Sequence, residues 1–227
     1  MDVPVLCFEI EGILVETAPA RRAALTTALA ADGLTLDDDT WDQVRSLTVE
    51  SAATRARRLL GAPEDPTAVT LATLRAEQAF ADRIARGITV APALLATLER
   101  LSAVARLAIV SRAGRREIDA LLERAGCTGL FRPILGADDL TQGLPAAWTR
   151  VVSQTQALFP GQHLQPYLVS DALETVREGR RAGLGTILVG NAPAHEAIEA
   201  DAWIESLADL TPDRVRGLGT SPSGDPL

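Results

Sequence analysis

The feature that most constrains this chain is an unbroken apolar run at residues 3–8, followed at once by Glu9, Glu11 and Gly12. Such a short run indicates a strand buried on both faces, and acids directly after it indicate that its carboxyl end opens onto a site. Helix-like and strand-like segments alternate through the rest of the chain. We therefore predict an α/β fold with a parallel sheet, in which ligands bind beyond the carboxyl ends of the strands.

Two later predicted strands, 107–110 and 166–169, also end in polar side chains. Ser111 and Arg112 follow the first of them, and Asp171 follows the second. A hydroxyl group between a strand and a helix N-terminus can join backbone N–H groups in holding an anion, whereas a plain turn serine is the alternative for Ser111. Carboxylates that converge from neighbouring strand ends can bind Mg²⁺.

The other segments carry fewer signals. A helix is predicted to start near Thr17, and no strand candidate interrupts residues 34–86. The acids at 37–39 are expected to cap a helix through its dipole rather than to bind a metal. The final segments are predicted to be helical and contain His195 and Trp203. We interpret His195 as a surface residue rather than a catalytic base.

The stretch Glu9-Ile10-Glu11-Gly12-Ile13-Leu14-Val15-Glu16-Thr17 resembles the first motif of the haloacid dehalogenase-like hydrolase superfamily, Asp-x-Asp-Gly-Thr-Leu-Val-Asp-Ser after a strand. The resemblance is strongest to the phosphoglycolate phosphatase and β-phosphoglucomutase branch. Ser111 stands where the second motif has Ser or Thr, Gly143-Leu144-Pro145 stands where the family has Gly-Lys-Pro, and Asp171 matches the first acid of the fourth motif.

The resemblance implies a domain organisation. A Rossmann-like α/β core with a parallel sheet would comprise residues 1–16 and 88–216. An all-helical cap would be inserted after the first strand at residues 17–87. Residues 217–227 are expected to form a flexible tail, because they are rich in Gly, Ser and Pro.

The resemblance also implies roles for individual residues. In the family the first acid attacks phosphorus, the second is a general acid and base, Mg²⁺ bridges the acids and the phosphate, and a lysine offsets negative charge. Carried onto this chain, Glu9 and Glu11 are the catalytic candidates, and Ser111 and Arg112 are the phosphate-binding candidates. Glu9, Glu11 and Asp171 are the candidate ligands of Mg²⁺.

Four positions depart from the family pattern: Glu9, Glu11, Ile13 and Leu144 replace Asp, Asp, Thr and Lys. Lysine is absent from the entire chain, so only an arginine could substitute, with Arg112 and Arg132 as candidates. Our first hypothesis is therefore a catalytically impaired protein that binds a small phosphorylated ligand or a protein partner. The alternative is an active Mg²⁺-dependent phosphatase that uses Glu9 as its nucleophile.

Composition limits the remaining classes. A net charge of −8 argues against general nucleic-acid binding. No apolar run approaches the roughly 20 residues that span a bilayer, and the start of the chain lacks a basic secretory flank, so we expect a cytoplasmic protein. Cys7 and Cys127 are expected to be buried thiols. A third hypothesis is an interaction module that forms a homodimer through the cap.

Overall fold

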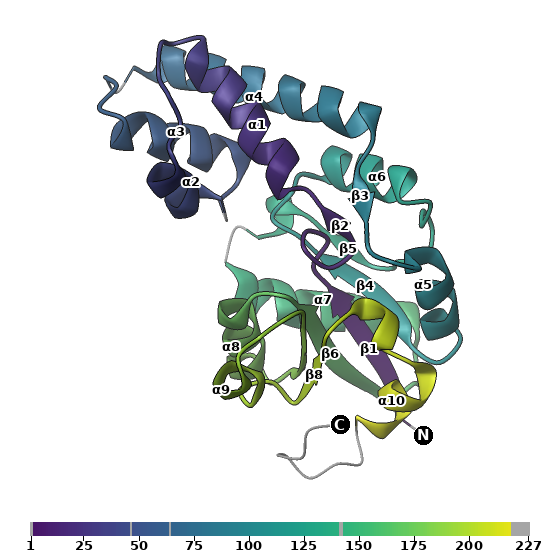
Figure 1. Ribbon diagram of the computed structural model, residues 1–227. Helices are drawn as coiled ribbons and strands as arrows, with labels where there is room; N and C mark the ends of the chain where they lie inside the picture. The colour runs from purple at the N-terminus through teal and green to yellow at the C-terminus, as the bar shows by residue number, and fades with distance from the viewer. Residues whose placement is uncertain (1, 46, 64, 141–142, 219–227) are drawn as a thin grey trace. The chain divides into compact units, whose positions relative to one another are not determined.

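The computed structural model describes residues 2–45, 47–63, 65–140 and 143–218. The chain divides into two compact units (Figure 1). The core unit comprises Met1–Val15 and Val90–Leu227, and the helical unit comprises Glu16–Thr89. The chain leaves the core unit at β2 (Val15–Glu16) and returns to it at β3 (Thr89–Val90), two strands that pair with each other.

The core unit is built on a parallel sheet, as the alternation of segments predicted. Within the described residues it has six strands in the order β5-β4-β1-β6-β7-β8, and every neighbouring pair is parallel. The apolar run 3–8 forms a strand near the middle of this sheet, between β4 and β6. Its side chains are apolar because both faces of the sheet are covered there. The strands are β1 (Val3–Phe8), β4 (Arg106–Val110), β5 (Ile134–Leu135), β6 (Leu164–Ser170), β7 (Gly185–Val189) and β8 (Ala202–Ile204).

Helices alternate with these strands in the core unit: α5 (Leu94–Ser102), α6 (Arg115–Arg124), α7 (Leu144–Leu158), α8 (Leu173–Arg181), α9 (Ala194–Ala197) and α10 (Pro212–Gly217). Two short 3-10 helices, Ala137–Asp139 and Leu207–Asp209, join them. Two sequence predictions were wrong here. Trp203 lies in β8 and not in a helix, and Gly217 ends α10 instead of starting a tail. The rest of the predicted tail, 219–227, lies outside the described residues.

Alternate residues of β1 point to opposite faces of the sheet, as strand geometry requires. Val5 and Cys7 pack into a cluster with Trp148 of α7, which is fully buried. Phe8 contacts the ring of Phe131 edge-on, with 5.8 Å between the ring centroids. Because β1 is buried on both faces of the sheet, its residues are apolar without a break. The same contacts hold the end of β1 in place.

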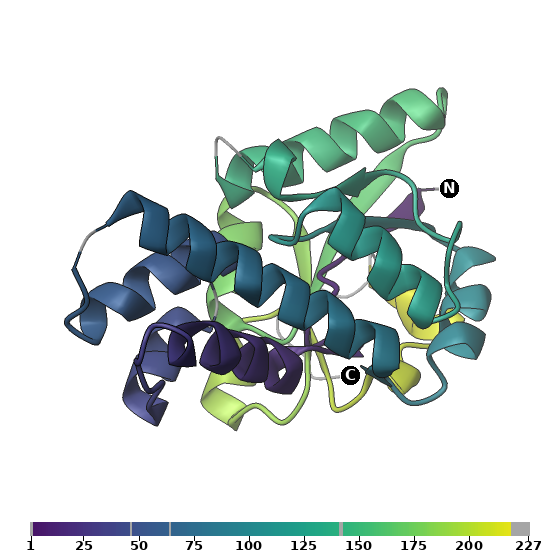
Figure 2. The ribbon, with the colours of Figure 1, turned by 90° about the horizontal axis from the view of Figure 1, so that it is seen from above.

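The helical unit consists of α1 (Ala18–Ala30), α2 (Asp38–Val44), α3 (Val49–Leu59) and α4 (Pro66–Arg86). Asp37 caps α2, since its Oδ1 accepts a hydrogen bond from the Thr40 N–H at 2.7 Å, which confirms the predicted capping role. Figure 2 shows α1 and α4 side by side. The unit has its own apolar core around Trp41 and Leu29. Asp32 adds ion pairs to Arg57 and Arg75.

The two cysteines are buried and unpaired, as expected. Burial raises the pKa of the Cys7 thiol to about 12 and that of Cys127 to about 11, so neither is a reactive thiolate near neutral pH. Among the described residues, none of the helices combines the length and the apolar character that crossing a membrane requires.

Candidate functional site

The candidate site lies in the core unit, at the carboxyl ends of three neighbouring strands. β4, β1 and β6 are adjacent and parallel, so their ends meet at one edge of the sheet. The register pairs Phe8, the last residue of β1, with Val169 of β6. The residues that come next along the chain are Glu9, Ser111 and Asp171. The fold therefore places these predicted site residues at the same edge.

Glu9 is partly buried at this edge, and four polar groups surround its carboxyl. Burial is the largest influence and raises the pKa of Glu9 to about 7, from an ordinary value of 4.5. A hydrogen bond from Ser170 and the positive charge of Arg112 oppose the rise, whereas the negative charges of Asp171 and Glu11 add to it. The structure thus brings Glu9, Glu11, Arg112 and Asp171 into one electrostatic cluster, as the sequence predicted.

The raised pKa of Glu9 has a consequence for stability. Between pH 4.5 and about 7 the folded chain keeps a proton on Glu9 that the unfolded chain has lost. Because the folded state then binds more protons, the free energy of unfolding should fall as pH rises through this interval. Below the interval both states are protonated, and above it both are ionised.

We predict that Glu9→Gln removes this contribution, because glutamine does not ionise. Urea unfolding at several pH values between 4.5 and 8 should show a shallower decline of stability for the variant than for the unmodified protein. Glu16→Gln is the matched control, since Glu16 is exposed. Equal pH dependence in Glu9→Gln and the unmodified protein would contradict the raised pKa.

Gly12 allows the loop after β1 to approach the end of β6. It has a φ of 77°, which favours glycine, and a Cβ built on it would lie 2.1 Å from the Asp171 Oδ2 atom. The Gly12 N–H also donates to the carbonyl oxygen of Val15 at 2.9 Å, which closes the turn. The glycine of the motif is therefore required by the close approach of the Asp171 carboxylate to the backbone.

Ser111 follows β4 and is buried, with 6% of its surface exposed. Its Oγ accepts a hydrogen bond from the Ala113 N–H at 3.1 Å, the arrangement of a turn serine. The hydroxyl proton is not used in that bond, so the same group can still donate to an anion. The turn and the anion-binding interpretations of Ser111 are compatible, and its role as a phosphate ligand stays a prediction.

The two arginines considered as substitutes for the missing lysine occupy opposite ends of the sheet. Arg112 follows the carboxyl end of β4 and lowers the pKa of Glu9 by its charge. Arg132 precedes β5, and its N–H donates to the carbonyl oxygen of Leu107 near the amino end of β4. Arg132 is therefore excluded as a substitute. Leu144 is the first residue of α7, and its side chain lies outside the described part of the chain.

The donors at this edge match the chemistry of Mg²⁺, although they do not form a closed cage. Within the described ranges, no group of three or more His, Cys, Asp or Glu side chains is arranged to hold a metal ion. Mg²⁺ needs only one or two carboxylates, because waters complete its shell. Glu9 and Asp171, whose charges interact directly, satisfy that requirement. The three-residue set predicted from the sequence, with Glu11 as a third ligand beside Glu9 and Asp171, is therefore not formed among the described residues.

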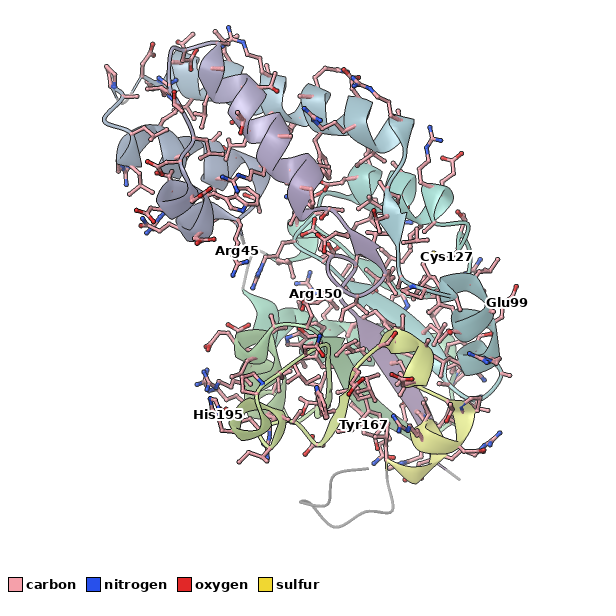
Figure 3. All side chains as sticks on the ribbon, in the orientation of Figure 1. Arg45, Glu99, Cys127, Arg150, Tyr167 and His195 are labelled. Atoms are coloured by element: carbon pink, nitrogen blue, oxygen red, sulfur yellow. The ribbon has the colours of Figure 1, made fainter. Side chains whose placement is uncertain are left out.

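His195 is exposed on α9, a helix of four residues, and Figure 3 shows its position there. This position agrees with the interpretation of His195 as a surface residue.

Sequence reasoning missed Ser170. It is the last residue of β6, it is fully buried, and its Oγ donates to Glu9 Oε2 at 2.5 Å. The sequence offers one signal for this contact. Ser170 directly precedes Asp171 of the fourth motif, so it stands at the end of the strand that leads to the site. Nothing in the sequence shows that Glu9 is long enough to reach it.

No family model matches the chain. The chain is 26% identical over 225 residues to a phosphoglycolate phosphatase from Caulobacter vibrioides, covering 96% of this chain and 93% of that protein. Its fold is similar to that of β-phosphoglucomutase from Clostridium difficile, with a TM-score of 0.77, 13% identity and coverage of 96% and 97% of the two chains.

A second similar fold is that of CbbY from Rhodobacter sphaeroides in complex with phosphate, with a TM-score of 0.76, 20% identity and coverage of 92% and 96% of the two chains. Sequence similarity over nearly the whole length, the parallel sheet and the order of the motifs agree with one another. Taken together, they show that the chain is similar, over nearly its whole length, to proteins of the phosphoglycolate phosphatase and β-phosphoglucomutase branch of the haloacid dehalogenase-like hydrolase superfamily.

Proposed function

We propose that the chain binds a small phosphorylated molecule at the carboxyl edge of β4, β1 and β6, and that its hydrolytic chemistry is impaired. The observation that carries this proposal is the state of Glu9. The carboxyl at the nucleophile position has a pKa of about 7 and accepts a hydrogen bond from Ser170 at 2.5 Å. A carboxyl with a raised pKa is a poorer nucleophile in the absence of a bound cation, because only its ionised form can attack.

The length of Glu9 weakens catalysis further. Relative to aspartate, its extra methylene displaces the carboxylate by roughly 1 Å, and a displacement of that size can cost on the order of 100-fold in rate. The absent lysine acts in the same direction, because losing one preorganised charge commonly costs roughly 3–4 kcal/mol of transition-state stabilisation. Neither change prevents an anion from binding in the ground state.

A phosphate group fits the donors at this edge. Arg112 is the guanidinium whose charge reaches Glu9, and arginine binds phosphate oxygens through two parallel N–H groups. The Ser111 hydroxyl adds a short-range donor at the end of β4. CbbY, whose fold is similar, has been solved in complex with phosphate, and this supports an anionic ligand for the present chain. A small ligand suits this cluster better than a protein partner, because the polar groups converge from three strand ends.

Mg²⁺ is part of this proposal as a bound ion. Glu9 and Asp171 would hold it, and it would supply positive charge that offsets the carboxylates and polarises a phosphoryl oxygen. Glu11 then contributes charge nearby, and Arg112 orients the anion. An interaction with a protein partner, and a homodimer formed through the helical unit, stay predictions that light scattering and pull-down experiments test.

We predict that Arg112→Ala weakens binding of inorganic phosphate by about tenfold or more, because a hydrogen bond to a charged group is lost. Isothermal titration calorimetry, with and without Mg²⁺, measures the dissociation constant. Arg132→Ala is the matched control, since it removes the same charge at the opposite end of the sheet, and its affinity should stay within about twofold of the unmodified protein. Equal losses in both variants, or an unmodified protein that binds no phosphate, would overturn the proposal.

A further inference from the structure

We propose that Ser170 is a positioning residue that holds the Glu9 carboxyl in one orientation, with Oε2 turned toward β6 and Oε1 left for the ligand. The part of this inference that concerns a ligand rests on the proposed function. The part that concerns the orientation of Glu9 does not.

The hydrogen bonds around Ser170 determine which group its hydroxyl proton is donated to. Ser170 is fully buried, and its Oγ accepts a hydrogen bond from the Ala172 N–H at 3.0 Å. With that acceptor position in use, the hydroxyl can donate either to Glu9 Oε2 at 2.5 Å or to the Ala172 carbonyl at 3.4 Å. The first distance is that of a strong O–H to carboxylate bond, and the second is near the limit for any hydrogen bond. The hydroxyl therefore donates to Glu9.

This hydrogen bond orders the Glu9 side chain in the proposal, because it is short and directional. The Ser170 hydroxyl donates to its carboxyl at 2.5 Å, the charge of Arg112 attracts it, and the charges of Asp171 and Glu11 repel it. A glutamate side chain that is not held populates several rotamers, and fixing it costs up to about 1.5–2 kcal/mol of entropy. Ser170 supplies the contact that offsets this cost and sets which oxygen faces outward.

The role of Ser170 is linked to the length of Glu9. β1 and β6 are paired in register, and the Glu9 N–H donates to the Val169 carbonyl at 3.2 Å, so the backbones at this point are fixed. The carboxyl of a glutamate reaches the hydroxyl from there. An aspartate, which is shorter by roughly 1 Å of reach, would leave the hydroxyl without this partner. Ser170 and Glu9 thus act as a pair.

The first test needs no ligand. In protein with ¹³C-labelled glutamate, side-chain relaxation of Glu9 should report one ordered rotamer in the unmodified chain and averaging in Ser170→Ala. The Glu9 signal is assigned by its absence from Glu9→Ala. Ser153→Ala is the matched control, because Ser153 is exposed on α7 and its hydroxyl donates to the Thr149 carbonyl at 3.0 Å. A Glu9 side chain that remains equally ordered in Ser170→Ala would overturn the proposal.

The second test is a double-mutant cycle on the dissociation constant for inorganic phosphate. Ser170→Ala should weaken binding about threefold or more, because a mobile Glu9 competes with the anion for Arg112. In the Glu9→Ala background the same substitution should have no further effect. Equal losses in both backgrounds would show a merely structural role and overturn the proposal. If the unmodified protein binds no phosphate, the proposed function fails, while the relaxation measurement still decides the role of Ser170.

Discussion

The double variant Glu9→Asp, Leu144→Lys should hydrolyse phosphate esters at least about 100-fold faster than the unmodified protein. Shortening residue 9 returns the carboxylate to the position of the family's nucleophile, and a shift of roughly 1 Å is worth on the order of 100-fold in rate. The shorter side chain also no longer reaches the Ser170 hydroxyl, which donates a hydrogen bond to Glu9 in the unmodified protein. The lysine restores a charge worth roughly 3–4 kcal/mol in the transition state.

The single variants separate these two contributions. Glu9→Asp and Leu144→Lys should each give a smaller gain than the pair, because the nucleophile and the cation act on the same developing charge. Glu9→Gln, Leu144→Lys is the matched control and should stay inactive, since it has the lysine but no carboxylate. The rates are measured as Mg²⁺-dependent release of phosphate from a panel of esters. A double variant no faster than the unmodified protein would show that residues 9 and 144 are not what limits catalysis.

Trp148→Ala should lower the free energy of unfolding by about 3–5 kcal/mol. Trp148 is fully buried and packs with Val5 and Cys7 on one face of the sheet. Its indole Nε1 is buried without a hydrogen-bond partner among the described residues, so the loss comes from packing alone. Because α7 begins only four residues earlier, at Leu144, this contact also fixes the start of the helix at the lysine position.

Trp148→Phe is the matched control for that packing. It keeps an aromatic ring and removes the unpaired N–H group, so the loss of stability should be clearly smaller than in Trp148→Ala. Urea unfolding followed by far-ultraviolet circular dichroism measures both, without relying on tryptophan fluorescence. A loss below about 1 kcal/mol for Trp148→Ala would mean that the site around Trp148 collapses without cost and that α7 is held by other contacts.

The sheet and most of the site were predictable from the sequence for a simple physical reason. Parallel strands meet at their carboxyl ends, so acids and hydroxyls that follow apolar runs come together wherever those runs are neighbours. The order of the segments in the sequence therefore predicts that Glu9, Ser111 and Asp171 lie at one edge of the sheet. The capping role of Asp37 was predictable because caps depend on local backbone geometry.

The errors came from features that sequence periodicity does not encode. Trp203 sits in a three-residue strand, and a run that short has no detectable period. Arg132 is near Ser111 in the sequence, but it precedes its strand and therefore lies at the amino end. The Ser170 to Glu9 hydrogen bond depends on how far one side chain reaches across a strand pair. Such distances require three-dimensional structure.

The most direct test of the central claim is hydrolysis of a panel of small phosphate esters by the unmodified protein with Mg²⁺, beside Glu9→Gln, at a concentration where phosphate binding has been measured. The account predicts that phosphate binds and that the unmodified protein turns over esters no faster than Glu9→Gln. Robust Mg²⁺-dependent turnover that Glu9→Gln abolishes would contradict it, and would identify Glu9 as a working nucleophile in an active phosphatase.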